Sequence, residues 1–123
     1  MFIKDHEILI LEDNPDRISK FLSLFNQAVV VDTVQAAISY IQTGKFKRLY
    51  LDHDLNNEAF VDSNRADCGM EVVRWIVKNK PIIPEIFIHS ANRRGSNMMY
   101  AALKSNGYNV SQFPFGGQFD DRE

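Results

Sequence analysis

Residues 49–55 read Leu-Tyr-Leu-Asp-His-Asp-Leu, so three apolar residues run directly into an Asp-His-Asp cluster. A short apolar run without alternation is typical of a strand buried on both faces, as in a parallel sheet. Ligands of open parallel sheets bind just beyond the carboxyl ends of the strands. Asp52, His53 and Asp54 fall at that position, and polar groups at the end of a buried strand need a partner. This cluster is therefore the first candidate site.

The composition is that of one globular domain over residues 1–123. Hydrophobic residues make up 45% and charged residues 24% of the chain, and the net charge is −2. This balance favours neither duplex DNA nor an anionic membrane surface as a partner, and no apolar run approaches the ~20 residues that span a bilayer. The acidic start lacks the apolar core of a signal peptide, and the single Cys68 cannot form an internal disulfide. We expect a cytoplasmic protein.

Strand-like and helix-like segments alternate along the chain. Aliphatic and aromatic runs predict strands over residues 8–11, 28–31, 49–51, 85–89 and 108–113. Apolar residues at helical spacing predict helices over residues 15–25, 34–41, 69–79 and 96–105. Asn14 or Asp13 is expected to cap the first helix, whose first turn holds Pro15.

Five short strands separated by helices predict an α/β domain with a doubly wound, five-stranded parallel sheet. Right-handed crossovers place helices on both faces of such a sheet. We expect the flavodoxin-like strand order 2-1-3-4-5, in which the first, third and fourth strands are neighbours. The polar segment 56–67 exceeds the usual ~2–6 residues of a strand-to-helix loop, which indicates a lid or recognition loop.

Polar side chains follow each of the three neighbouring strands. The residues concerned are Glu12 and Asp13 after the first strand, Asp52, His53 and Asp54 after the third, and His89, Ser90 and Asn92 after the fourth. Converging carboxylates repel one another unless a cation lies between them or some stay protonated. Oxygen ligands suit Mg²⁺, whereas ligation by either histidine would extend the choice to Mn²⁺ or Zn²⁺. The sequence thus predicts a metal-binding pocket for a phosphorylated partner.

The chain resembles response-regulator receiver domains over residues 8–114. Similar segments are the first strand with its acid pair (8–13), the strand that ends in the phospho-accepting Asp (51–52), the glycine-led helix (69–73) and the Ser-Ala pair (90–91). The resemblance implies Mg²⁺ held by Glu12, Asp13, Asp52 and the carbonyl group of Asp54. It also implies that the Ser90 hydroxyl faces the phosphoryl group.

Two departures point to a divergent branch of that family. The Lys-Pro pair that follows the fifth strand of receivers is replaced by Phe113-Pro114, and the fifth helix is expected to be missing. Two histidines that ordinary receivers lack are present, His53 and His89. This set resembles the cyclic-phosphate-processing receiver-like domains. Membership implies a metal-assisted phosphoesterase activity on cyclic phosphates of nucleotides or RNA ends.

The predicted roles follow from these residue types. Glu12, Asp13 and Asp52 would hold the metal ion, which would polarise a phosphoryl oxygen. His53 or His89 would act as general acid or base, because imidazole titrates near neutral pH. The expected phosphate-binding groups are Ser90, Asn92 and Arg93, the last at the start of a helix whose amino end favours anions.

Structural interpretations of the same residues stay open. Asp13 and Asn14 could serve only as helix caps. The side chain of His53 should point away from that of Asp52 if the strand continues, in which case His53 could be a structural hydrogen-bonding group. Arg93 could lie in a solvated turn.

Two other functions also stay open. A receiver-type domain would accept phosphate on Asp52, and a non-catalytic module would bind a phosphorylated ligand without turning it over. Without a fifth helix, one face of the sheet needs cover from the tail, through Phe113, Phe115 and Phe119, or from a second copy of the chain in a homodimer.

Overall fold

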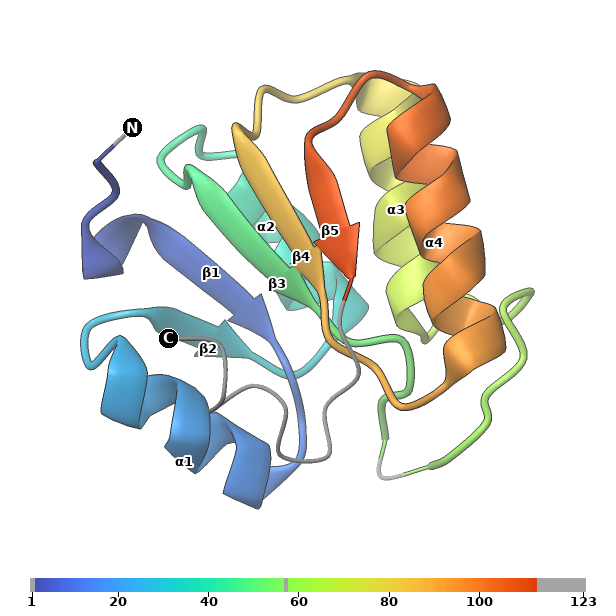
Figure 1. Ribbon diagram of the computed structural model, residues 1–123, viewed down its shortest axis with the longest axis horizontal. Helices are drawn as coiled ribbons and strands as arrows, with labels where there is room; N and C mark the ends of the chain where they lie inside the picture. Colours follow the sequence, from blue (N-terminus) through green and yellow to red (C-terminus); the bar gives the residue numbers. More distant parts are fainter. Residues whose placement is uncertain (1, 57, 113–123) are drawn as a thin grey trace.

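The computed structural model of the chain describes residues 2–56 and 58–112. These residues form one five-stranded sheet in the order β2-β1-β3-β4-β5, and every neighbouring pair is parallel (Figure 1). The strands are β1 (Ile8–Leu11), β2 (Val29–Val31), β3 (Arg48–Leu51), β4 (Glu85–Ile88) and β5 (Val110–Gln112). The helices are α1 (Pro15–Leu24), α2 (Val34–Ile41), α3 (Gly69–Asn79) and α4 (Arg93–Ser105), and a short 3-10 turn, Asp5–Glu7, precedes β1. The predicted fold class and strand order are confirmed.

Helices cover both faces of the sheet. α1 lies on one face, and α2, α3 and α4 pack on the other (Figure 1). Alternate strand residues serve the two sides because successive side chains of a strand point in opposite directions. Leu9, Leu51 and Ile88 belong to the large core under α2–α4, whereas Ile10 and Tyr50 belong to the smaller core under α1.

The smaller core is aromatic. The Phe21 ring of α1 lies 5.0 Å from the Tyr50 ring and 4.8 Å from the His89 ring, measured between centroids. Tyr50 in turn stacks on Phe87 at 5.1 Å. α1 is therefore fixed to the sheet directly beneath the carboxyl ends of β3 and β4.

Side-chain caps set the start of three helices. Asn14 accepts hydrogen bonds from the amides of Asp16 and Arg17, so Asn14 rather than Asp13 caps α1. Thr33 caps α2 through the amide of Ala36. Asn92 caps α4 through the amide of Gly95, as an N-cap side chain does when it accepts from the first turn.

Several predicted boundaries were wrong by one to three residues. α4 begins at Arg93 rather than at residue 96, because the Asn92 cap starts a first turn whose polar residues and glycine carry no apolar pattern. α1 ends at Leu24, β2 begins at Val29, β4 ends at Ile88 and β5 spans only Val110–Gln112. The predicted absence of a fifth helix and the predicted cover by Phe113, Phe115 and Phe119 concern residues outside the described part of the chain.

Within residues 2–56 and 58–112, no helix combines the length and the apolar character that crossing a membrane requires.

The aromatic contacts of α1 predict a large effect of truncating Phe21. Phe21→Ala removes a fully buried ring and should lower the free energy of unfolding by about 3–5 kcal/mol, measured by urea denaturation. Leu24→Ala is the matched control, because Leu24 lies on the same helix and is 49% exposed; it should change stability by less than about 1 kcal/mol. Equal losses in the two variants would show that α1 is not held through Phe21.

Candidate functional site

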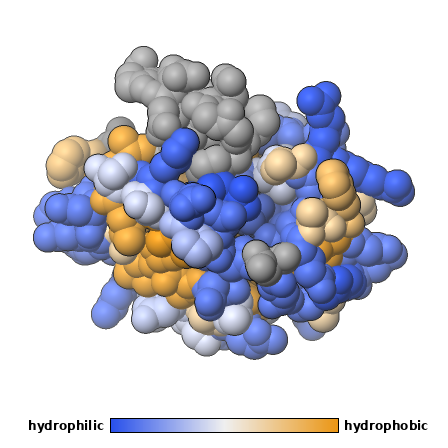
Figure 2. Space-filling view, turned by 90° about the horizontal axis from the view of Figure 1, so that it is seen from below, coloured by the Kyte–Doolittle hydropathy of each residue, from blue (hydrophilic) through white to orange (hydrophobic). Residues whose placement is uncertain are grey.

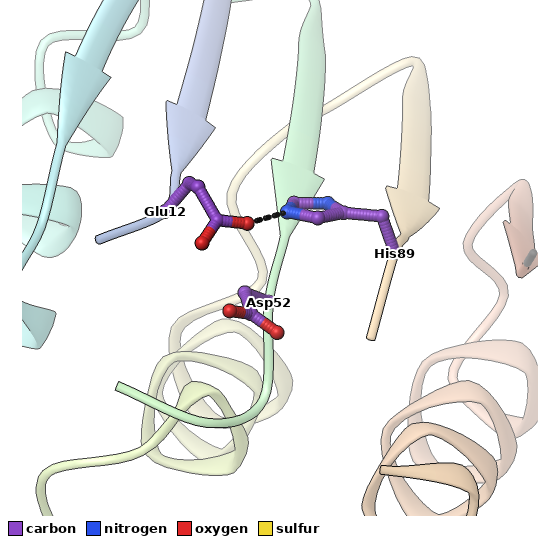
Figure 3. A group of neighbouring side chains, drawn as sticks. All are labelled: Glu12, Asp52 and His89. Atoms are coloured by element: carbon purple, nitrogen blue, oxygen red, sulfur yellow. Dashed lines mark hydrogen bonds and ion pairs between the residues drawn. The ribbon is translucent and has the colours of Figure 1, made fainter. Parts of the chain in front are cut away.

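Three buried side chains from three strands meet at the carboxyl edge of the sheet. Glu12 follows β1, Asp52 follows β3 and His89 follows β4, and one potential ligand atom from each lies within 4.8 Å of the others (Figure 3). Their exposed fractions are 0%, 1% and 0%. The sequence analysis predicted that these residues converge, and the structure brings them together.

The sheet register explains this convergence. Ile10, Tyr50 and Phe87 are partners across β1, β3 and β4, and their side chains point to the α1 face. Two residues further along each strand, the side chains return to the same face. The backbone pairing also continues beyond the strands, since the Asp52 amide donates to the Leu11 carbonyl and the His89 amide to the Leu51 carbonyl. The three polar residues therefore occupy one row of the sheet.

Glu12 is held on both carboxylate oxygens. Oε1 accepts hydrogen bonds from His89 Nε2 at 2.9 Å and from Arg17 Nε at 3.1 Å. Oε2 accepts from the backbone amides of Asp13 at 3.1 Å and Asn14 at 2.9 Å. Burial by itself would raise the pKa of Glu12, but the hydrogen bonds from His89 and Arg17 outweigh it and keep the pKa below its usual value. Glu12 is thus an ionised and firmly positioned carboxylate.

Asp52 has a different environment. Among the described residues, no hydrogen-bond donor reaches its buried Oδ2 atom, and the nearest cation is Arg17 Nη2 at 3.6 Å. Burial and the negative charge of Glu12 raise the pKa of Asp52 to about 8. Two carboxylates so close together cannot both ionise easily without more positive charge. Asp52 is therefore protonated at neutral pH unless a cation joins the cluster.

The cluster fits a divalent cation on its own chemistry. Two carboxylates and an imidazole are a donor set that Mg²⁺, Mn²⁺ or Zn²⁺ can use. Among residues 2–56 and 58–112, no donor reaches the buried Asp52 Oδ2 atom, and a bound cation would supply the positive charge that this atom needs. Burial lowers the pKa of His89, so its imidazole is neutral at physiological pH, as ligation requires.

Sequence reasoning missed Arg17. Its guanidinium group joins the two acids, through Nε to Glu12 at 3.1 Å and through Nη2 to Asp52 at 3.6 Å. Arg17 lies one helical turn after the Asn14 cap, and that turn of α1 faces the ends of β1 and β3. The only sign of this role in the sequence is that Arg17 lies three residues after the helix cap, within reach of the acid pair Glu12 and Asp13.

Two of the predicted metal ligands are not among the three grouped residues. Asp13 is half-buried beside Glu12 and is not one of the three grouped residues. The carboxylate of Asp54 is engaged elsewhere: its Oδ1 atom accepts from His53 Nδ1 at 2.8 Å and its Oδ2 atom from the Phe60 amide at 2.8 Å. Binding of the cation by the Asp54 carbonyl group stays a prediction.

His53 faces the opposite side of the sheet from Asp52, as strand alternation predicts. Its ring is fully buried between the 56–67 loop and α4, with Nε2 2.8 Å from Ser63 Oγ. Asn92 completes this second cluster, since its amide group donates to Asp54 Oδ1 at 2.9 Å and to the Val61 carbonyl at 3.2 Å. The long loop is therefore tied to the strand end and to the start of α4.

Two glycines permit the close packing around this strand end. A Cβ atom on Gly69 would overlap the carbonyl oxygen of Asp52, and one on Gly95 would overlap the His53 ring. The Gly69 amide also donates to the His53 carbonyl at 2.8 Å. The glycine that begins α3 is thus required by backbone contact with the site.

The predicted phosphate-binding residues lie next to both clusters. Ser90 is buried, and its hydroxyl oxygen accepts from the Asn92 amide at 3.1 Å. Arg93 is exposed at the first position of α4. Figure 2 shows the end of the molecule at which the carboxyl ends of the strands lie. This surface is mainly hydrophilic, and hydrophobic residues gather toward its sides.

The family model for the cyclic-phosphate processing receiver domain matches residues 8–105, which include every strand except β5 and all four helices. The chain belongs to this family. Among solved structures, the domain is similar to the signal receiver domain of a Vibrio parahaemolyticus protein described as a Luxo repressor, with a TM-score of 0.61 and 20% identity over 93% of this chain and 82% of that one. The comparison with curated proteins found no match.

This receiver-like domain of a cyclic-phosphate-processing family should become more stable when Asp52 is neutralised. An unfolded Asp has a pKa near 3.9, whereas that of folded Asp52 is about 8. Unfolding releases a proton between these values, so the folded state loses stability as pH rises through the window. In EDTA at pH 7, Asp52→Asn should raise Tm by roughly 5 °C or more, and the gain should vanish near pH 4.

Asp5→Asn is the matched control for this melting experiment, because Asp5 precedes β1 at the opposite end of the sheet. It should leave the pH dependence of Tm unchanged. A lower Tm for Asp52→Asn at pH 7 would show that Asp52 is ionised and paired in the folded protein.

Proposed function

We propose that this domain is a metal-dependent phosphoesterase that opens cyclic phosphates of nucleotides or of RNA ends. The observation that carries the proposal is the convergence of Glu12, Asp52 and His89, buried and within 4.8 Å of one another, at the carboxyl edge of the sheet. The family description, cyclic-phosphate processing, supports cyclic phosphates as the substrate class.

Glu12 and Asp52 would hold the cation, and His89 lies within reach of both, either as a third ligand or as the acid–base group. A bound divalent ion, Mg²⁺ first and Mn²⁺ or Zn²⁺ as alternatives, supplies positive charge that polarises a phosphoryl P–O bond. The pKa of Asp52 is raised because the residue is buried beside Glu12. A cation would offset these effects, so Asp52 would lose its proton to solvent when the cation enters. The pocket would thereby exchange a protonated acid for an ionised ligand.

We assign the general acid–base role at this site to His89 rather than to His53. His89 belongs to the metal cluster and is oriented by Glu12 Oε1 at 2.9 Å, whereas His53 lies on the opposite side of the sheet and bonds to Asp54 and Ser63. An imidazole of neutral form can take a proton from an attacking group and return it to a leaving oxygen. In this proposal His89 either ligates or transfers the proton, and the variants below separate the two roles.

The phosphate oxygens would lie toward the start of α4. Ser90 brings a hydroxyl group to the end of β4, and Arg93 brings a cation to the amino end of a 13-residue helix. Helix amino ends favour anions because their amides and dipole point toward the ligand. Asn92 would contribute through position, since its side chain already holds the amide of Gly95 and the carboxylate of Asp54.

Two other functions use the same pocket. A receiver would form an aspartyl phosphate on Asp52, which lies at the end of β3 in a fold shared with a signal receiver domain. A sensor would bind a phosphorylated ligand without turnover.

The proposal predicts turnover of 2′,3′-cyclic nucleotides that requires a divalent ion. A panel of the four nucleotides with Mg²⁺, Mn²⁺ or Zn²⁺ should give hydrolysis that falls about 100-fold or more in Asp52→Asn and in His89→Gln. If His89 is a ligand, excess metal restores part of the activity of His89→Gln; if it transfers the proton, metal has no effect.

Asp5→Asn serves again as control and should retain full activity. Acetyl phosphate and ligand-induced shifts in Tm complete the experiment. Stable phosphorylation of Asp52, or stabilisation by cyclic nucleotides without hydrolysis, would replace the phosphoesterase proposal by the receiver or the sensor function.

A further inference from the structure

A second set of polar side chains forms a hydrogen-bonded chain outside the metal cluster. Asp54 Oδ1 lies 2.8 Å from His53 Nδ1, and His53 Nε2 lies 2.8 Å from Ser63 Oγ. A carboxylate, an imidazole and a hydroxyl linked in this order are the parts of a serine nucleophile with its base and the group that orients the base. The sequence analysis did not single out Ser63, because it lies ten residues from His53 in a polar loop.

The carboxylate fixes the tautomer of the imidazole. Asp54 accepts four hydrogen bonds, from His53, Asn92 and the amides of Phe60 and Val61, so it is an ionised acceptor. His53 Nδ1 must then carry the hydrogen atom that it shares with Asp54. In the neutral ring Nε2 is left as the acceptor, and the Ser63 hydroxyl donates to it. Burial lowers the pKa of His53, but hydrogen bonds with Cys68 and Asp54 outweigh burial and raise it, so the protonated ring, in which Nε2 donates to Ser63, is also favoured. The neutral ring is the form that can take the serine proton.

The three groups are held rigidly. The His53 ring is fully buried, and its packing against Gly95 leaves no space for even a Cβ atom there. The backbone at Ser63 is clamped from outside by Arg74, whose Nη1 donates to the Ser63 carbonyl at 2.7 Å and whose Nη2 donates to the Arg65 carbonyl at 2.8 Å. Positioning of this kind is what a catalytic constellation requires.

A cavity opens beside the serine. It has a volume of ≈ 410 Å³ between the 56–67 loop and the start of α4, and its lining includes Phe60, Asp62, Ser63, Asn92, Arg94 and Met98. This volume is in the range of small-molecule sites. The formal charges of Asp62 and Arg94 cancel in this lining. The amino end of α4 is the positive end of the helix dipole, so negative charge that develops on a substrate at that end would be stabilised.

We propose that Ser63 is a nucleophile, with His53 as its general base and Asp54 as the group that orients His53, and that the cavity takes small carboxylic esters. The three catalytic groups differ from those of the proposed phosphoesterase, because the metal cluster lies on the α1 face of the sheet and this set lies on the α4 side, although both proposals use the region at the start of α4.

The reaction follows from the hydrogen bonds. Ser63 Oγ forms a bond to the carbonyl carbon while its proton passes to His53 Nε2. The bond to the leaving alcohol breaks, and His53 gives that proton to the leaving oxygen. A water molecule then loses a proton to His53 and attacks the same carbon, the Oγ–C bond breaks, and Oγ takes the proton back. One ester and one water become one acid and one alcohol, and the serine is restored.

Covalent labelling tests this proposal without a known substrate. The intact chain is incubated with diisopropyl fluorophosphate in EDTA, and the modified residue is located by mass spectrometry of peptides. Ser63 Oγ should displace fluoride from phosphorus and add one diisopropylphosphoryl group to the peptide that contains Ser63. Labelling should be absent in Ser63→Ala and about 100-fold slower in His53→Gln.

Ser105→Ala is the matched control, because Ser105 is an exposed serine on α4, and it should label at the wild-type rate. Each variant is melted first, so that the rates refer to folded protein. No label on the folded wild type, a label that persists in Ser63→Ala, or an unchanged rate in a folded His53→Gln would each overturn the proposal and leave the network a purely structural clamp.

Ester hydrolysis gives a second readout. Hydrolysis of 4-nitrophenyl acetate in EDTA should fall about 100-fold in Ser63→Ala and stay unchanged in Ser105→Ala. A rate in folded Ser63→Ala equal to that of the wild type would contradict the proposal. Failure of the metal-dependent phosphoesterase would leave these results untouched, because every measurement is made in EDTA.

Discussion

The shared register of β1, β3 and β4 is the constraint on which the rest of this structure depends. Parallel pairing aligns Leu11, Leu51 and Ile88 in one row, so the residue that follows each of them must lie at the same edge and on the same face. Glu12, Asp52 and His89 are brought together by the backbone before any attraction between side chains acts. A shift of one residue in any strand would move its polar group to the opposite face.

That constraint creates an electrostatic problem. Burial of two carboxylates side by side is unfavourable, and the surroundings of the two carboxylates differ. Glu12 receives donors on both oxygens and stays ionised, whereas Asp52, within the described part of the chain, has the Arg17 charge at 3.6 Å and stays protonated. An acid held in its protonated form next to a fixed carboxylate and a neutral imidazole is poised to exchange its proton for a cation. The stability that this arrangement sacrifices is typical of sites kept for function.

Much of this fold follows from the sequence because local signals agree with one another. The apolar runs, the Asn14 and Thr33 caps and the glycine at residue 69 each point to the same alternation of strands and helices. Alternation along β3 also predicts that Asp52 and His53 face opposite sides.

The sequence does not show which side chains reach from one helix, strand or loop to another. Arg17 is one polar residue on an amphipathic helix, and Ser63 is one of many polar residues in a long loop. The start of α4 was misplaced for a related reason, because a polar first turn depends on the Asn92 cap and has no apolar periodicity.

Calorimetric titration of the folded domain with Mg²⁺ and Mn²⁺ would show whether Asp52, with Glu12 and His89, forms a divalent metal site. Titrations at pH 7 in two buffers of different ionisation enthalpy report both affinity and proton release. We expect saturable binding that releases close to one proton, that is lost in Asp52→Asn, and that is retained in Asp5→Asn. Absence of saturable binding to the folded wild type, or binding that Asp52→Asn leaves unchanged, would contradict it.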